Sequence, residues 1–363
     1  MLGGGEIIGE LEMSWDELLD HGDEPFDVPF PPIYDDDVCP SLTLKAAIVY
    51  ACDDKDGALF DSLIDCEIAR DTDTGHAQFA KYMTSKTVSH LNNAVQHFQL
   101  VLDKCPVSHP DHATALTNLA WARLIGYSRD GLQDIDATTS LFRDALALRP
   151  QPHPDHPLSL YDLILALTWR HNKKSTVADI RESAQLYHEV LPLCTEGTYL
   201  RNIAAGGNGV DYVIVECINL LTDASDEGIH LRTVVLELCP LGHRLRHRAF
   251  DELAAAVRAR FDQHGSIDDL DTSIQLCREA VSLCSEGHDV YLNNLAYSLQ
   301  LRFQHQGNPN DLDEAISLHE EVLCLRPVGH EYRDSSLDNL GVVWGAKLLG
   351  VSFAGCNRQN SVL

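Results

Sequence analysis

The sequence DLDEAISLHEEVLCLRP, residues 311–327, is the clearest of six copies of one helical pattern along the chain. Successive copies begin 44, 45, 45, 45 and 42 residues apart. Their first positions, apolar in every copy except the fourth, are Leu91, Ile135, Ile180, Ser225, Leu270 and Leu312. A fixed period in this range is typical of stacked helical repeats, in which each unit buries its apolar face against its neighbours.

At three further positions the residue type is similar in all six copies. The residue three after the first position is small in every copy: Ala94, Thr138, Ser183, Gly228, Ser273 and Ala315. The residue ten after it is Val or Ala: Val101, Ala145, Val190, Val235, Ala280 and Val322. The residue eleven after it is Leu or Val: Leu102, Leu146, Leu191, Leu236, Val281 and Leu323. These positions lie on one side of an α-helix, so they predict a buried face that another helix backbone approaches closely.

A partner helix is expected to follow each repeated helix. Prolines that mark a helix end follow four copies, at Pro106, Pro150, Pro240 and Pro327. The partner helices have apolar residues at Leu116, Leu160, Phe250, Leu292 and Leu337. Towards their ends they have basic residues, which we interpret as complementing the helix dipole: Arg170, Arg260, Arg302 and Lys347. The expected fold is a mostly α-helical, right-handed α-solenoid of antiparallel helix pairs over residues 56–350.

The charge balance excludes several classes of partner. The 363 residues include 27 Lys and Arg against 55 Asp and Glu, which gives a net charge of −28. A field of this sign repels nucleic-acid backbones and anionic lipid headgroups. No run of about 18 apolar residues predicts a membrane span, and no secretory signal opens the sequence. We therefore expect a cytoplasmic protein without a nucleic-acid partner.

The eleven cysteines indicate reduced thiols. Four occur at the same position, fourteen residues into their copies: Cys105, Cys194, Cys239 and Cys284. A zinc site needs ligands that converge, whereas equivalent residues of neighbouring repeats are more than one helix-packing distance apart. We interpret these cysteines as helix-end residues and expect neither a metal site nor a cofactor.

The sequences of the two helices resemble those of tetratricopeptide repeats, in residues 292–296 (LNNLA) and 313–318 (DEAISL). The long period resembles that of the kinesin-light-chain variety. Residues 109–112 (HPDH) and 116–123 (LTNLAWAR) further resemble a fungal family of such proteins, over roughly residues 40 to 344. Members of that family often continue into a CHAT domain, a caspase-like cysteine peptidase fold, for which we find no segment here.

The tetratricopeptide resemblance implies that the first helices of successive pairs line a concave groove. Side-chain amides there would hold the backbone of an extended peptide. The matching polar positions are Asn118, Asp162, Glu252, Asn294 and Asn339. The remaining copy has Ala205 and Gly207 there, inside the run AGGNG at residues 205–209, and glycine at this density is expected to break the helix. A phosphate-binding loop is the alternative for this run, but it lacks the Gly-Lys-Ser/Thr ending.

The sequence is compatible with three functions. The first is a non-catalytic scaffold that binds a peptide or partner domain in an acidic groove. The second is the sensor arm of a truncated CHAT-type peptidase effector. The third is an enzyme, but no nucleophile, base and orienting residue stand apart from the repeat positions, so no catalytic residue is predicted. The HPDH motif is interpreted as turn and cap residues.

Residues 1–55 are predicted to form a separate β-strand segment. Residues 26–30 and 41–50 alternate apolar and polar side chains between turns rich in Pro and Asp. Their order resembles the closing strands of the calcium- and lipid-binding β-sandwich of protein kinase C, which would make the segment a truncated sandwich. Asp35, Asp36 and Asp37 could hold a hard cation or form a solvated turn. Residues 56–88 are expected to be helical and to cover the first repeat, and residues 351–363 to form a divergent tail.

Overall fold

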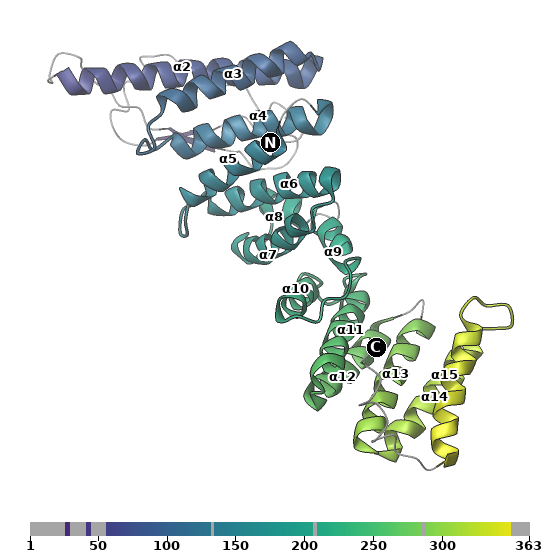
Figure 1. Ribbon diagram of the computed structural model, residues 1–363. Helices are drawn as coiled ribbons and strands as arrows, with labels where there is room; N and C mark the ends of the chain where they lie inside the picture. The colour runs from purple at the N-terminus through teal and green to yellow at the C-terminus, as the bar shows by residue number, and fades with distance from the viewer. Residues whose placement is uncertain are drawn as a thin grey trace, which may run out of the picture. The chain divides into compact units, whose positions relative to one another are not determined.

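The computed structural model (Figure 1) describes residues 26–29, 41–44, 56–131, 134–205, 209–284 and 288–349. The chain divides into two compact units, residues 1–148 and 149–363, and each is described by itself. No helix within the described residues is long and apolar enough to cross a membrane.

The described residues of the first unit form two strands and four helices. The elements are β1 (Phe26–Pro29), β2 (Ser41–Leu44), α2 (Asp56–Ser85), α3 (Val88–Lys104), α4 (His112–Asp130) and α5 (Ile135–Ala147). Each helix packs against the next along the chain, and short connections turn the chain back between them (Figure 1). The expected helix after residue 56 is thus present as α2, and it packs along α3 with Phe79 and Tyr82 against Leu91 and Phe98.

The second unit contains ten described helices. They are α6 (His156–Lys174), α7 (Val177–Leu193), α8 (Tyr199–Ala204), α9 (Val210–Ile218), α10 (Asp226–Glu237), α11 (Arg246–His264), α12 (Ile267–Leu283), α13 (His288–Gln306), α14 (Pro309–Leu325) and α15 (Arg333–Leu349). The hairpins α6–α7, α11–α12 and α13–α14 have the tightest packing, and α12 packs on α13 as α14 packs on α15 (Figure 1). Stacked antiparallel helix pairs are the predicted architecture.

The predicted buried face of the repeated helix is confirmed. Ala94, Ser183, Ser273 and Ala315 at the small position have no exposed surface at all. The position seven residues later, ten after the first, is also buried in all six copies. At the small position a larger residue would collide, and the fourth copy shows how closely. A Cβ added to Gly228 would come within 2.4 Å of the carbonyl oxygen of Asp223.

One core position was missed from the sequence. The residue seven after the first position is at most 3% exposed in every copy, and its members are Phe98, Phe142, Tyr187, Arg232, Cys277 and His319. The residues eleven after the first position are instead only half-buried. This buried position is therefore aromatic in the first three copies and Arg, Cys or His in the last three.

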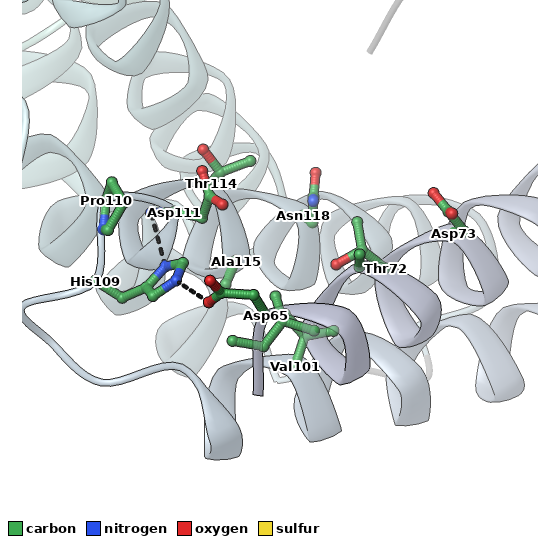
Figure 2. Close-up of a pocket in the computed structure, with 12 residues that line it drawn as sticks. Asp65, Thr72, Asp73, Val101, His109, Pro110, Asp111, Thr114, Ala115 and Asn118 are labelled. Atoms are coloured by element: carbon green, nitrogen blue, oxygen red, sulfur yellow. Dashed lines mark hydrogen bonds and ion pairs between the residues drawn. The ribbon is translucent and has the colours of Figure 1, made fainter. Parts of the chain in front are cut away.

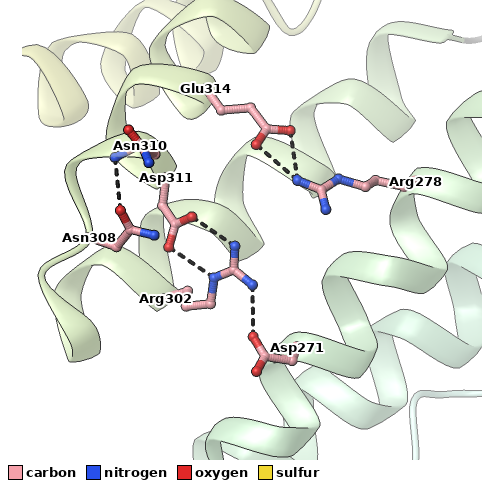
Figure 3. A network of polar contacts seen from close by, with 7 residues as sticks. All are labelled: Asp271, Arg278, Arg302, Asn308, Asn310, Asp311 and Glu314. Atoms are coloured by element: carbon pink, nitrogen blue, oxygen red, sulfur yellow. Dashed lines mark hydrogen bonds and ion pairs between the residues drawn. The ribbon is translucent and has the colours of Figure 1, made fainter.

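The basic residues near the ends of the partner helices do more than complement a dipole. Arg302 of α13 donates two hydrogen bonds to the carboxylate of Asp311 in the first turn of α14, Nε to Oδ2 at 2.9 Å and Nη2 to Oδ1 at 2.7 Å (Figure 3). The same two-bond pair joins Arg170 to Asp179, and Arg260 to Asp269. Hydrogen bonding to Asp311 raises the pKa of the Arg302 guanidinium. Each pair fastens the two helices of one hairpin across their connecting turn.

Two of these arginines also reach the preceding helix pair. Arg302 donates through Nη1 to Asp271 of α12 at 2.7 Å (Figure 3). Arg260 donates to Asp226 of α10 at 3.0 Å. Lys347 occupies the equivalent position of the last pair and contacts Asp313 at 2.8 Å. The arginines therefore hold both the hairpin and the stack.

The third copy is interrupted at the glycine run, as predicted. Helix α8 ends at Ala204 and α9 begins at Val210. In the following copy Ser225 is the N-cap of α10, and its hydroxyl accepts a hydrogen bond from the backbone N–H of Gly228. Buried Arg232 donates to the carbonyl oxygens of Cys217, at 2.7 Å, and Leu220, at 2.8 Å, at the end of α9. A charged side chain thus bonds carbonyl groups that have no partner within their own helix.

The N-terminal segment is described only at its two strands. β1 and β2 pair antiparallel, with Phe26 opposite Leu44 and Pro29 opposite Ser41. The aspartates at 35–37 and the remainder of residues 1–55 lie outside the described residues, as does the tail at 351–363. The β domain and its sandwich resemblance therefore stay predictions.

Candidate functional site

A pocket of about 530 Å³ lies in the first unit, between α2 and α4. Its lining comes from the two helices, the loop before α4 and one residue of α3 (Figure 2). Ile68, Val101 and Ala115 are buried and form its apolar floor. Asp65, Asp73 and Asp111 are exposed at its rim, and the lining has no lysine or arginine. The pocket therefore combines an apolar base with a negative rim.

His109 fixes one end of this rim. Its Nδ1 accepts a hydrogen bond from the backbone N–H of Asp111 at 3.1 Å, so the ring proton is on Nε2. That nitrogen donates to Oδ1 of Asp65 at 3.0 Å (Figure 2). The backbone N–H of His109 in turn donates to the carbonyl oxygen of Pro106. A single loop histidine thus orients one carboxylate of α2 next to the start of α4.

The same loop geometry returns in other copies. The Nδ1 atoms of His153, His243 and His330 each accept the backbone N–H two residues later, at 3.1–3.2 Å. His112, at the start of α4, bonds the carbonyl oxygen of Cys105 through its Nδ1 at 2.8 Å and so closes the end of α3. The structure therefore uses the HPDH motif as a turn and a cap, as the sequence indicated.

The predicted groove positions lie on the partner helices, but in different surroundings. Asn118 on α4 lines the pocket of the first unit and is half-buried (Figure 2). In the second unit, Asp162 on α6 is 1% exposed. Oε2 of Glu252 on α11 lies 3.6 Å from Nη2 of Arg232. Asn294 on α13 and Asn339 on α15 are half-buried. Asn118 is therefore the candidate that the structure places at a pocket.

Two of the asparagines bridge neighbouring partner helices. The side-chain amide of Asn294 donates to both carboxylate oxygens of Asp251, at 2.9 and 3.1 Å. The amide of Asn339 donates to Oδ1 of Asn293 at 3.1 Å. In each bond the side-chain NH₂ group is the donor, and the side-chain oxygen of the same asparagine takes no part. These positions therefore stabilise the stack and also present a hydrogen-bond acceptor.

Burial weakens the acidity of this part of the second unit. It raises the pKa of Asp251, against the opposing effect of the bond from Asn294. Burial likewise raises the pKa of Glu252, against the attraction of Arg232. Both carboxyl groups are therefore weaker acids than an exposed aspartate or glutamate.

The shared cysteine position consists of buried or half-buried thiols. Cys105, Cys194 and Cys239 are buried at the helix ends, and Cys284 is half-buried in the same place. Burial raises the pKa of the Cys239 thiol to about 12, and it also raises the pKa values of the Cys105 and Cys194 thiols. Thiols with such values stay protonated, and the thiolate is the nucleophile and metal ligand. No cluster of metal-ligating side chains occurs among the residues that the structure describes.

Comparison with known proteins finds no family model and no curated protein that matches the sequence. Among solved structures, a kinesin-light-chain protein of Podosopora anserina with nearly identical TPR-like repeats is 15% identical, with a TM-score of 0.27. The alignment covers 70% of this chain and 97% of that protein.

Two further structures are similar over much of the chain. The RpL4 assembly chaperone Acl4 is 12% identical with a TM-score of 0.31, covering 76% of this chain and 98% of its own. The S. pombe nuclear import adaptor Nro1 is 13% identical with a TM-score of 0.24, covering 79% of this chain and 95% of its own. These TM-scores are low, so the assignment as a TPR-like helical repeat depends on the chain's own periodic helices and buried positions.

Proposed function

We propose that this chain is a non-catalytic scaffold that binds a peptide or a partner domain along its partner helices. The observation that carries this proposal is the pocket between α2 and α4, with three aspartates at its rim, Asn118 in its lining and no lysine or arginine among its described lining residues. An asparagine amide both donates and accepts, so Asn118 can bond the N–H and C=O groups of an extended backbone. Helical-repeat proteins commonly bind their partners along such extended surfaces.

The charge of the surface favours a basic or neutral ligand. The whole chain has a net charge of −28, and the pocket rim has the same sign. A negative field of this kind attracts cationic segments and repels acidic ones, which selects partners and speeds their association. The sensor arm of a CHAT-type effector, implied by the family resemblance, would use the same surface and stays a second hypothesis.

The proposal can be tested by removing two groove amides. The full chain is immobilised against a library of extended peptides at low and high salt, as wild type and as the double variant Asn118→Ala with Asn294→Ala. We expect the bound peptides to be basic or neutral and the double variant to bind them roughly thirtyfold more weakly, since two lost hydrogen bonds at about 1 kcal/mol each sum to about 2 kcal/mol. Binding should also weaken as salt rises.

The matched control removes two exposed asparagines from the repeated helices, Asn93 of α3 and Asn310 of α14. Asn93→Ala with Asn310→Ala is expected to leave the affinity unchanged. Circular dichroism of both double variants shows whether they are folded. Equal affinities in the two folded variants, or no binding by the wild type at either salt concentration, would contradict the proposal.

A further inference from the structure

The carboxylates of the pocket rim stand at its two ends. The carboxylate of Asp65 and the backbone N–H of Asp111 both bond His109 at one end, and Asp73 lies at the other end (Figure 2). Asp65 and Asp73 are eight positions apart within α2, which places them about 12 Å apart along the helix axis. The rim therefore has two separate negative ends and not one acidic centre.

The space between the two ends is apolar below and polar above. Ile68, Val101 and Ala115 provide a floor on which aliphatic stems can lie. Asn118 lies between the two ends along α4, where it can bond a peptide backbone (Figure 2). Lysine and arginine suit such a site, because they bury an aliphatic stem on apolar surface and keep the charged end in a polar rim.

The spacing selects a register for an extended ligand. Residues i and i+4 of a β-strand point to the same face and are about 13 Å apart. This distance matches the axial separation of Asp65 and Asp73, whereas i and i+2 span only about 7 Å. We infer that the pocket binds an extended peptide through two basic side chains four residues apart, one at each acidic end. This inference rests on the proposed scaffold function and specifies the ligand of its pocket.

The test compares peptides that differ only in the spacing of two arginines. Nine-residue peptides of serine and alanine carry one arginine, or two arginines separated by one, three or five residues, and each is titrated against the full chain by fluorescence anisotropy. We expect the peptide with three intervening residues to bind about tenfold more tightly than the single-arginine peptide. The other two spacings should gain less than threefold.

A charge-matched pair of variants locates the effect. Asp65→Asn with Asp73→Asn removes the charges at both ends of the pocket, and it should abolish the preference for three intervening residues. Asp103→Asn with Asp144→Asn removes the same number of charges from exposed positions of α3 and α5 outside the pocket, and it should keep that preference.

Two results would overturn the inference. One is an affinity that does not depend on arginine spacing. The other is an equal loss in the two double variants, which would indicate general attraction to an acidic protein. Failure of every arginine peptide, while library peptides still bind in a manner that needs Asn118 and Asn294, would refute the two-arginine ligand and leave the scaffold function standing.

Discussion

Replacing Arg302 with methionine is expected to destabilise the chain by about 3–5 kcal/mol, since the substitution strands a buried carboxylate. The side chain of Asp311 is only 4% exposed, and that of Arg302 is 19% exposed. Without the guanidinium, Asp311 keeps its charge in a site with little water, or takes up a proton at a cost in free energy. The bond to Asp271 on the preceding helix pair is lost as well. Urea unfolding followed by circular dichroism measures the effect.

Arg278 provides the control within the same stack. It bonds both carboxylate oxygens of Glu314, at 3.0 and 2.9 Å, but the two side chains are 43% and 40% exposed (Figure 3). Arg278→Met is therefore expected to cost less than about 1 kcal/mol, as exposed ion pairs do. If the two variants lose equal stability, the two-bond arginine pairs do not fasten the hairpins as described.

Replacing His319 with leucine is expected to stabilise the chain, and to stabilise it most at low pH. The side chain of His319 has no exposed surface, and neither ring nitrogen has a hydrogen-bond partner among the described residues. Burial, together with the charge of nearby Arg326, lowers the pKa of His319 to about 4 from its ordinary value of 6.5. Leucine has a similar volume and no polar atoms to bury, so at pH 7 we expect a gain of about 1–3 kcal/mol.

The pH dependence has a definite sign. Between pH 6.5 and 4 the unfolded chain binds a proton at His319 and the folded chain does not, so stability falls as the pH is lowered through this window. The shift from 6.5 to about 4 corresponds to about 3 kcal/mol, reached below pH 4. The difference in unfolding free energy between wild type and His319→Leu should therefore widen by this amount from pH 7 to pH 4. A difference that stays constant with pH would contradict a buried neutral imidazole.

The repeat pattern was sufficient to predict much of the fold. Its small and Val/Ala positions repeat residue type as well as spacing, so Ala94 and Ala315 could be assigned to one environment, which the structure confirms. The glycine run at 205–209 predicted the break between α8 and α9 for the same local reason. These features depend on residues that are close together in the sequence, so helix periodicity predicts them directly.

The position seven residues into the repeated helix shows why other features were missed. It begins as Phe98, Phe142 and Tyr187, but continues as Arg232 and His319, whose polarity hides the shared burial. Buried Arg232 bonds carbonyl oxygens at the end of α9, which no residue of its own helix could supply. Such a substitution depends on tertiary contacts, which residue types at fixed spacing do not reveal.

The arginine pairs and the pocket were missed for a related reason. Arg302 and Asp311 are nine residues apart across a turn, outside the three- and four-residue spacings at which helix neighbours are sought. Asn118 was predicted from its place in the repeat, whereas Asp65 and Asp73 belong to α2, which precedes the first recognisable copy. An aspartate pair eight residues apart in a helix is the signal that could have indicated the rim.

Hydrogen–deuterium exchange of the full chain with a bound partner locates the docking surface that we propose on the partner helices. The partner is recovered by cross-linked pull-down, purified and added at saturation. We predict slower exchange in α2 and α4 around Asp73 and Asn118, and in α13 around Asn294, with the repeated helices α3, α12 and α14 unchanged. Slower exchange confined to those repeated helices, or to residues outside the helix pairs, would contradict the account.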